Sequence, residues 1–160
     1  MSSKIKTILS QKAEKTFEEL AFLFVFSGDE ADFAQADPAV AARVSFSGVF
    51  SGTLVMKLSA EVLPELTANM LGVNDEEETT LDQQYDALKE TINVVCGNLL
   101  PELGGDQEVF NIDPPQIVAE DEAVKKDNEQ SLVCNATLAF DEGICELFLF
   151  SDDQILINLG

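Results

Sequence analysis

The chain has 160 residues, of which 46% are hydrophobic, and it carries 9 basic against 30 acidic residues, a formal net charge of −21. This length and composition suit one globular domain over residues 1–160. The negative charge argues against nucleic acid and against anionic membrane surfaces as partners. Because histidine is absent, a Ser-His-Asp triad, Cys-His catalysis and histidine metal sites are excluded.

The sequence also indicates a location in the cell. No segment has the pattern of a signal peptide, and the longest apolar run, residues 20–26, is too short to span a bilayer. Cys96, Cys134 and Cys145 are odd in number and each lies in an apolar run, as is typical of buried free thiols in a reducing compartment. We therefore expect a soluble, cytoplasmic protein.

The first expected elements are a helix and a hairpin. From Lys4 to about Phe24 the apolar residues share one helical stripe, made of Ile5, Ile8, Leu9, Phe17, Leu20 and Phe24. Residues 28–38 are acidic and alanine-rich, and we expect a loop. Residues 43–58 alternate as in a β-hairpin, with Gly48 and Gly52 around a turn that needs positive φ or close packing.

Two helices follow the hairpin. Ser59 is the expected N-cap of a short helix that ends at Gly72, with Pro64 in its first turn. Residues 75–78 are consecutive acids, which do not supply the alternating ligands of a calcium loop, so a solvated loop is expected. Thr80 and Gln83 then have the spacing of a capping box.

The second long helix is expected to run to about Leu100 and to stop before Pro101. Its core face has helical spacing and consists of Leu81, Tyr85, Leu88, Ile92, Val95 and Leu99. Residues 103–113 form a glycine-containing connection, residues 116–118 a strand, and residues 121–130 a charged, exposed segment. Residues 132–140 and 144–150 predict a second hairpin, and the tail at 154–159 is either a strand or a turn.

This order of elements predicts the fold class. Helix, hairpin, helix, helix, strand and hairpin give two loosely similar halves, each a long helix followed by strands. We expect an α+β fold in which long helices pack on a mostly antiparallel β-sheet.

The outer face of the second long helix carries the candidate site. Asp86, Glu90, Asn93 and Gly97 fall within roughly 60° of arc at about 100° per residue. Every helix of an acidic protein has a polar face, so a solvated surface is the alternative interpretation. Against it, Asn is a mediocre residue for a helix interior, and Gly costs about 1 kcal/mol there relative to Ala. Gly97 would either let another backbone approach or serve core packing.

The spacing of these side chains suggests a chemical role. An amide can hold a water molecule through both its donor and its acceptor, and a carboxylate one turn away can pair with a lysine of a partner. The arrangement suits the positioning of a water for attack on a group that another protein carries.

At these residues the chain resembles the CheC/CheX family of chemotaxis phosphatases. Its pattern is Asp or Ser, then Glu four residues later, then Asn after three more, and Asp86, Glu90 and Asn93 match it. Pro115 follows one residue sooner than the family's proline, and because Pro114 is adjacent to it, which proline of the pair matches that position is left open. The hairpin FSGVFSGTLVMKLS is also similar, and the likeness is strongest over residues 43–118.

The resemblance favours the CheX type. CheC-type members carry the signature on both long helices, whereas the first helix here offers only Ser10, Glu14 and Phe17 at those positions. A phenylalanine cannot orient a water molecule. We therefore expect this copy of the site to be absent, with its face used for packing.

The family's activity implies roles for the matched residues. CheX-type proteins dephosphorylate the phosphorylated response regulator CheY, in chemotaxis or another two-component pathway. By this resemblance, Glu90 would pair with the regulator's active-site lysine and Asn93 would orient the attacking water. Asp86 would support the face or make flanking contacts, Gly97 would allow close approach, and Pro115 would be structural.

The resemblance also implies partners and cofactors. Magnesium would belong to the regulator's acidic pocket, so no metal or other cofactor is expected on this chain. CheX-type proteins are homodimers joined through sheet edges, and a homodimer is expected here. The rival function is a binding module without catalysis, similar to domains of the flagellar switch. A metal-binding acidic protein is disfavoured, because histidine and an EF-hand loop are both absent.

Overall fold

The computed structural model describes residues 4–27, 39–74, 79–105, 109–119, 122, 130–141 and 143–153. The expectations for residues 28–38, 75–78 and 154–159, and for most of 121–130, lie outside the described residues. Three helices are described, α1 (Lys4–Ala21), α2 (Leu63–Leu71) and α3 (Leu81–Gly104).

The described strands form one seven-stranded sheet in which every pairing is antiparallel. The strand order is β1-β6-β7-β3-β2-β4, and β5 also pairs with β2. The strands are β1 (Phe26–Ser27), β2 (Ala39–Ser47), β3 (Gly52–Ser59), β4 (Asn111–Ile112), β5 (Gln116–Val118), β6 (Ser131–Ala139) and β7 (Ile144–Ser151).

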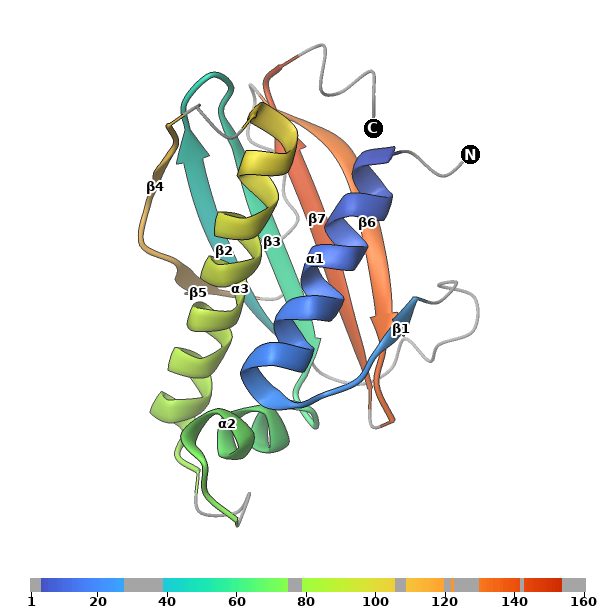
Figure 1. The fold of residues 1–160 in the computed structure, drawn as a ribbon. Helices are drawn as coiled ribbons and strands as arrows, with labels where there is room; N and C mark the ends of the chain where they lie inside the picture. Colours follow the sequence, from blue (N-terminus) through green and yellow to red (C-terminus); the bar gives the residue numbers. More distant parts are fainter. Residues whose placement is uncertain are drawn as a thin grey trace.

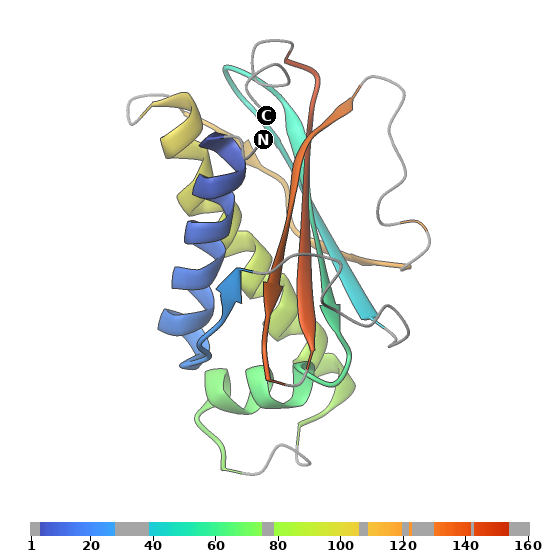
Figure 2. The ribbon, with the colours of Figure 1, turned by 90° about the vertical axis from the view of Figure 1, so that its right-hand side faces the viewer.

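The helices and the sheet form two layers. Helices α1 and α3 lie side by side across one face of the sheet, and α2 crosses one end of it (Figures 1 and 2). Each long helix is followed by strands, β1 to β3 after α1 and β4 to β7 after α3. The α+β fold with a mostly antiparallel sheet is confirmed.

Helix α1 buries a single stripe and ends earlier than expected. Its buried apolar residues recur every four positions, as Ile5, Leu9, Ala13, Phe17 and Ala21. Phe22 has a left-handed φ of 54°, which ends the helix, and Phe24 is 74% exposed, so its predicted place in the stripe is wrong. The chain turns here because Leu23 enters the core and Phe26–Ser27 pair with β6.

Both predicted hairpins are present, β2–β3 and β6–β7. Gly48 and Gly52 serve close packing: a Cβ at Gly48 would collide with the Phe110 ring, and one at Gly52 with the carbonyl oxygen of Phe150. The strands β1 and β4 were not predicted, because two residues are too few to show an alternating pattern.

Helix α2 begins differently from the prediction. Its N-cap is Val62 and not Ser59, because the Ser59 hydroxyl instead accepts a hydrogen bond from the backbone N–H of Ile144, at 3.0 Å. Three residues of turn separate Ser59 from the helix. The other two expectations are confirmed: Pro64 lies in the first turn, and Gly72 closes the helix in the left-handed region with φ 73°.

Helix α3 starts as predicted and ends later. The Thr80 hydroxyl accepts from the Gln83 N–H at 3.1 Å, and the Thr80 N–H donates to Gln83 Oε1 at 2.9 Å, which completes the capping box. The predicted stop before Pro101 is wrong, since the helix continues to Gly104. Burial of Leu100 holds the last turn helical despite the proline that follows it.

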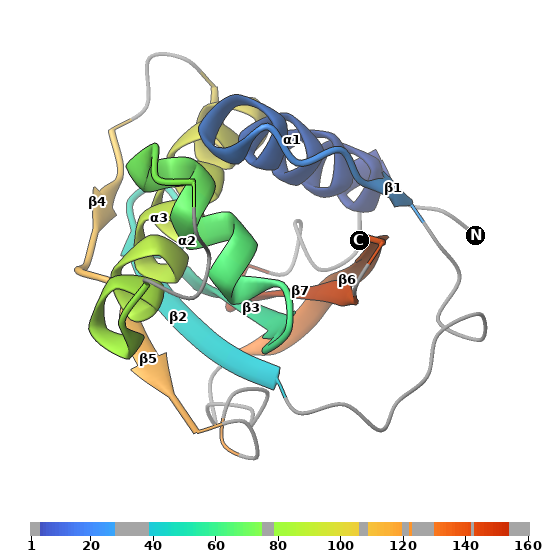
Figure 3. The same cartoon turned by 90° about the horizontal axis from the view of Figure 1, so that it is seen from below.

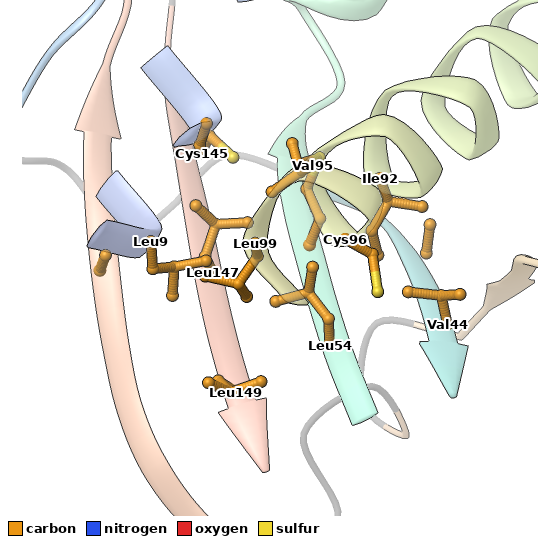
Figure 4. Packing of buried hydrophobic residues seen from close by; sticks show 14 of the residues in the cluster. Leu9, Val44, Leu54, Ile92, Val95, Cys96, Leu99, Cys145, Leu147 and Leu149 are labelled. Carbon is orange, nitrogen blue, oxygen red and sulfur yellow. The ribbon is translucent and has the colours of Figure 1, made fainter. Parts of the chain in front are cut away.

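The core lies between α1, α3 and the sheet (Figure 4). On α3 it takes up Leu88, Ile92, Val95 and Leu99, none of which is exposed. The predicted core face extends one turn too far towards the N-terminus, because Leu81 is 57% exposed and Tyr85 is only half-buried. The core therefore fixes one side of α3 and leaves the opposite side exposed to solvent.

No helix in the described ranges has the length and apolar character that a membrane span requires.

The three cysteines are free and buried, as expected. Burial raises the pKa of Cys96 from 9.0 to about 12 and that of Cys134 to about 11, and it also raises the pKa of Cys145. The neutral thiols are thus favoured in the folded state.

These thiols predict a pH dependence of stability. Below pH 9.0 the thiols are protonated in both states, whereas above it the unfolded thiols ionise first. The free energy of unfolding should therefore fall as pH rises from 9.0 towards 12, by up to about 1.4 kcal/mol per pH unit for each thiol. Urea titrations across this range measure the slope. Cys96→Ala should make it shallower, and an unchanged slope would contradict the prediction.

Candidate functional site

The outward face of α3 presents all four predicted helix residues. Asp86, Glu90, Asn93 and Gly97 are each exposed, while Leu88 on the opposite side is fully buried. The capping box fixes the start of the helix one turn before Asp86, and the core contacts fix its roll. The predicted face is therefore held on a rigid element and open to a partner.

A groove runs along one flank of this face. Asp86, Lys89, Glu90 and Asn93 line it from α3, and Pro114 and Pro115 line it from the segment between β4 and β5, enclosing about 350 Å³. Figure 3 shows this segment passing beside the helix. Two separate segments of the chain thus meet at one site, and both prolines, not Pro115 alone, form its wall.

The proline wall is anchored at both ends. Before the prolines, Ile112 pairs with Phe46 of β2 and the Asp113 N–H donates to the Ser45 carbonyl at 2.9 Å. After them, Ile117 pairs with Ala42 of the same strand. Because β2 belongs to the central sheet, the prolines keep a fixed position relative to α3.

An aromatic cluster adds to this anchoring. The Phe110 ring lies 5.1 Å from the Phe50 ring and 6.2 Å from the Phe46 ring, centroid to centroid. A Cβ at Gly104 would come within 2.7 Å of the Phe110 ring, so the glycine that ends α3 lets the aromatic side chain fit against it. The end of α3 and the start of the proline segment are therefore packed together.

A second hollow, of about 300 Å³, lies on the other flank of the face. Its α3 lining is Gln83, Asp86, Ala87 and Glu90, and its α2 lining is Met70 and Leu71. Asp86 and Glu90 border both hollows and so form a ridge between them. The sequence did not point to the α2 residues, because nothing in the chain near them indicates that α2 meets α3 there.

Asp86 of the ridge forms an ion pair with Lys89, which lines the groove. Lys89 Nζ lies 3.4 Å from Asp86 Oδ1, with the lysine side chain 38% and the aspartate side chain 77% exposed. Lys89 was not among the site residues predicted from the sequence, although its three-residue spacing from Asp86 is a recognised signal for such a pair. The site thus holds a cation as well as two carboxylates and an amide.

Gly97 lies on open surface. A Cβ built at Gly97 would have no atom within 4 Å, apart from its own helix and chain neighbours, and the residue is exposed. The alternative that this glycine serves core packing is therefore wrong. Pro101, four residues on, has no N–H to donate to the Gly97 carbonyl, so this turn of α3 is weaker than the turns before it.

The first helix does not repeat the site. Phe17, at the position that would need an asparagine, is fully buried and packs edge-on against Phe140 at 5.0 Å. This agrees with the expectation that the corresponding face of α1 serves packing.

Metal-binding clusters are also missing from the part of the chain that the structure describes. No group of three or more cysteine, aspartate or glutamate side chains there could hold a metal ion.

The sequence matches the profile described as chemotaxis phosphatase CheX over residues 40–137, which is more than half of the chain. This chain belongs to the CheX family. The matched region contains β2, β3, α2 and α3 with all of its exposed face, and it continues through the proline wall into β6.

Solved CheX structures share the fold. CheX from Desulfovibrio desulfuricans superposes with a TM-score of 0.74 at 14% identity, covering 92% of this chain and 99% of that one. CheX from Vibrio vulnificus gives 0.73 at 16% identity, covering 92% and 97%. Borrelia burgdorferi CheX, solved as a CheX–CheY–BeF3–Mg complex, gives 0.69 at 15% identity, covering 95% and 100%. No match is found among curated protein sequences.

Proposed function

We propose that this CheX-family chain is a phosphatase that hydrolyses the phosphoaspartate of a CheY-like response regulator. The observation that carries the proposal is the exposure of Glu90 and Asn93, one helical turn apart, on a rigid face beside a proline-walled groove. The Borrelia burgdorferi relative, crystallised as a complex with CheY, supports this class of partner.

The proposed mechanism divides the work between the two side chains. Glu90 pairs with the active-site lysine of the regulator and fixes the orientation of docking. Asn93 then reaches the phosphoryl group and holds a water through its amide donor and acceptor. The water oxygen bonds to phosphorus, the bond between phosphorus and the aspartyl oxygen breaks, and phosphate and a carboxylate are released, with the water's proton passing to the products.

The remaining site residues have supporting roles in this proposal. Asp86 flanks the contact, Gly97 lets the partner approach, and Pro115 shapes the wall together with Pro114. Magnesium is held by the regulator's acidic pocket, and this chain needs no cofactor of its own. The proposed setting is the cytoplasm, where a chemotaxis or related two-component regulator is found.

The direct test is phosphate release from a phosphorylated receiver domain, measured with and without this protein. We expect release faster than the receiver's own hydrolysis. The rival function, a binding module without catalysis, predicts equal affinity for phosphorylated and unphosphorylated receivers and no change in rate. Screening several receiver domains in the same assay also identifies the one served.

We further propose that the protein is a homodimer joined through the edges of its sheets. Near one edge, the outermost described strand β1 has only two residues, which pair with Leu138 and Ala139 of β6. Light scattering should then give twice the 17.4 kDa mass of the chain. A monomeric mass at micromolar concentration would contradict this.

Gly97→Ala should raise the stability of the protein and lower its affinity for the receiver. The added methyl group meets no neighbouring atom, and alanine is favoured over glycine in a helix by about 1 kcal/mol, so the urea midpoint should rise. If the partner approaches closely at this turn, affinity for the receiver should fall in the same variant. Higher stability with unchanged affinity would remove Gly97 from the interface.

A further inference from the structure

Lys89 has no role in the mechanism above, although it lines the same groove as Glu90 and Asn93. We propose that the Lys89 ammonium group binds the anionic phosphoryl oxygens of the docked partner, and that Asp86 positions Lys89 for this contact. The proposal rests on the proposed function and adds to it a determinant of selectivity for the phosphorylated partner.

The helix geometry places Lys89 next to Asn93. At about 100° per residue, Lys89 lies about 40° to one side of Asn93, and Glu90 about 60° to the other side. Both precede Asn93 by about one turn, at the spacings that bring helix side chains together. A phosphoryl group that reaches Asn93 therefore has a carboxylate on one flank and an ammonium group on the other.

The residues that line the two hollows show on which flank of the α3 face Lys89 lies. Lys89 lines the groove with Pro114 and Pro115 and is not among the residues of the α2 hollow. Its side chain is 38% exposed against 77% for Asp86, so the lysine is partly covered by the groove and still open to solvent. The lysine thus faces the space that a docked group would enter.

The ion pair with Asp86 can persist on docking, because an ammonium group has three N–H donors and can bind a second acceptor. At 3.4 Å and with a well-exposed aspartate, it is a surface pair of small net stability. It nevertheless holds Lys89 beside Asp86 in the free protein, which lowers the entropy lost when a phosphate binds. Asp86 is in this sense a positioning residue, acting through Lys89.

The charge of the chain gives the contact its importance. With 9 basic against 30 acidic residues, the protein repels an anionic partner over most of its surface. A phosphorylated aspartate adds negative charge to a receiver pocket that is already acidic. A single ammonium group at that point offsets part of this repulsion, and it does so more for the phosphorylated form.

The test compares Lys89→Gln with Lys89→Arg and with Lys15→Gln as a matched control. Lys15 also forms an intrahelical ion pair, with Glu19 at 3.8 Å, but on α1 and outside the groove. All three variants lie on the surface, and their urea midpoints should stay close to that of the wild type. Affinities are measured for the phosphorylated and the unphosphorylated receiver at low and high salt.

We expect Lys89→Gln to weaken binding of the phosphorylated receiver about tenfold, with little effect on the unphosphorylated one and a shallower salt dependence. Lys89→Arg should keep most of the selectivity, and Lys15→Gln should change neither affinity. Equal losses for both receiver forms, or an equal loss in Lys15→Gln, would overturn the proposal.

A double-mutant cycle tests the role of Asp86. If Asp86 acts through Lys89, Asp86→Asn should weaken phosphoreceiver binding in the wild-type background and have no further effect in Lys89→Gln. Additive losses would show that Asp86 acts independently. The proposed function fails separately, if the wild-type protein releases no phosphate. Should it release phosphate while Lys89→Gln matches the wild type in selectivity, only the inference about Lys89 is wrong.

Discussion

Asn93→Ala should lower the protein's acceleration of phosphate release by about 100-fold, the usual effect of removing one polar group that acts in the transition state. The Asn93 amide is exposed and lies on the groove side of α3, so its removal leaves no buried group without a partner. Because alanine is also the better helix former, stability should not fall. Phosphate release under single-turnover conditions measures the effect on the chemical step.

Affinity distinguishes this outcome from a simple loss of docking. If Asn93 orients water, Asn93→Ala should still bind the phosphorylated receiver with nearly wild-type affinity. Asn98→Ala is the matched control, since Asn98 is another exposed asparagine of α3, about 140° around the helix from Asn93. Full activity in Asn93→Ala, or an equal loss in Asn98→Ala, would rule out the proposed role of the amide.

Glu90→Lys should abolish both binding and phosphate release. The substitution replaces a carboxylate at the crest of the ridge with an ammonium group, which would face the regulator's lysine as a like charge. Glu90→Gln keeps the size of the side chain and removes only its charge, so a smaller loss, of about tenfold in affinity, is expected. Titration calorimetry with the phosphorylated receiver measures both.

The control for charge alone is Glu18→Lys, which makes the same change of two units on the exposed side of α1. This variant should bind and act as the wild type does. If Glu90→Lys retains tight binding, Glu90 does not contact a lysine and the docking arrangement proposed here is wrong. Should binding survive while release is lost, Glu90 acts in the chemistry.

Much of the fold follows from patterns within single segments. The Thr80–Gln83 box and the alternation in both hairpins were predictable, because capping and amphipathic periodicity are local properties of the chain. The exposed face of α3 was predictable for the same reason, since Glu90 and Asn93 are fixed relative to Leu88 by helix geometry alone.

The errors of prediction arose where distant residues override local preference. Ser59 looked like an N-cap, but its hydroxyl is bound by the backbone of Ile144 in the neighbouring strand. Pro101 looked like the end of a helix, but packing of Leu100 in the core and an ion pair between Lys12 and Glu102, at 3.2 Å, hold the last turn against α1. Neither the contact between Ser59 and Ile144 nor that between Lys12 and Glu102 can be predicted from the spacing of residues in the sequence.

The same distinction applies to the candidate site. The sequence by itself determined the helix that carries Asp86, Glu90, Asn93 and Gly97, because side chains three and four residues apart must share a face. Only the tertiary structure decided what surrounds that face. Pairing of β4 and β5 with β2 brings the prolines to one flank, and packing of α2 on α3 places Met70 and Leu71 on the other. These contacts join segments far apart in the chain, and their register is set by sheet hydrogen bonds and core packing that no single segment specifies.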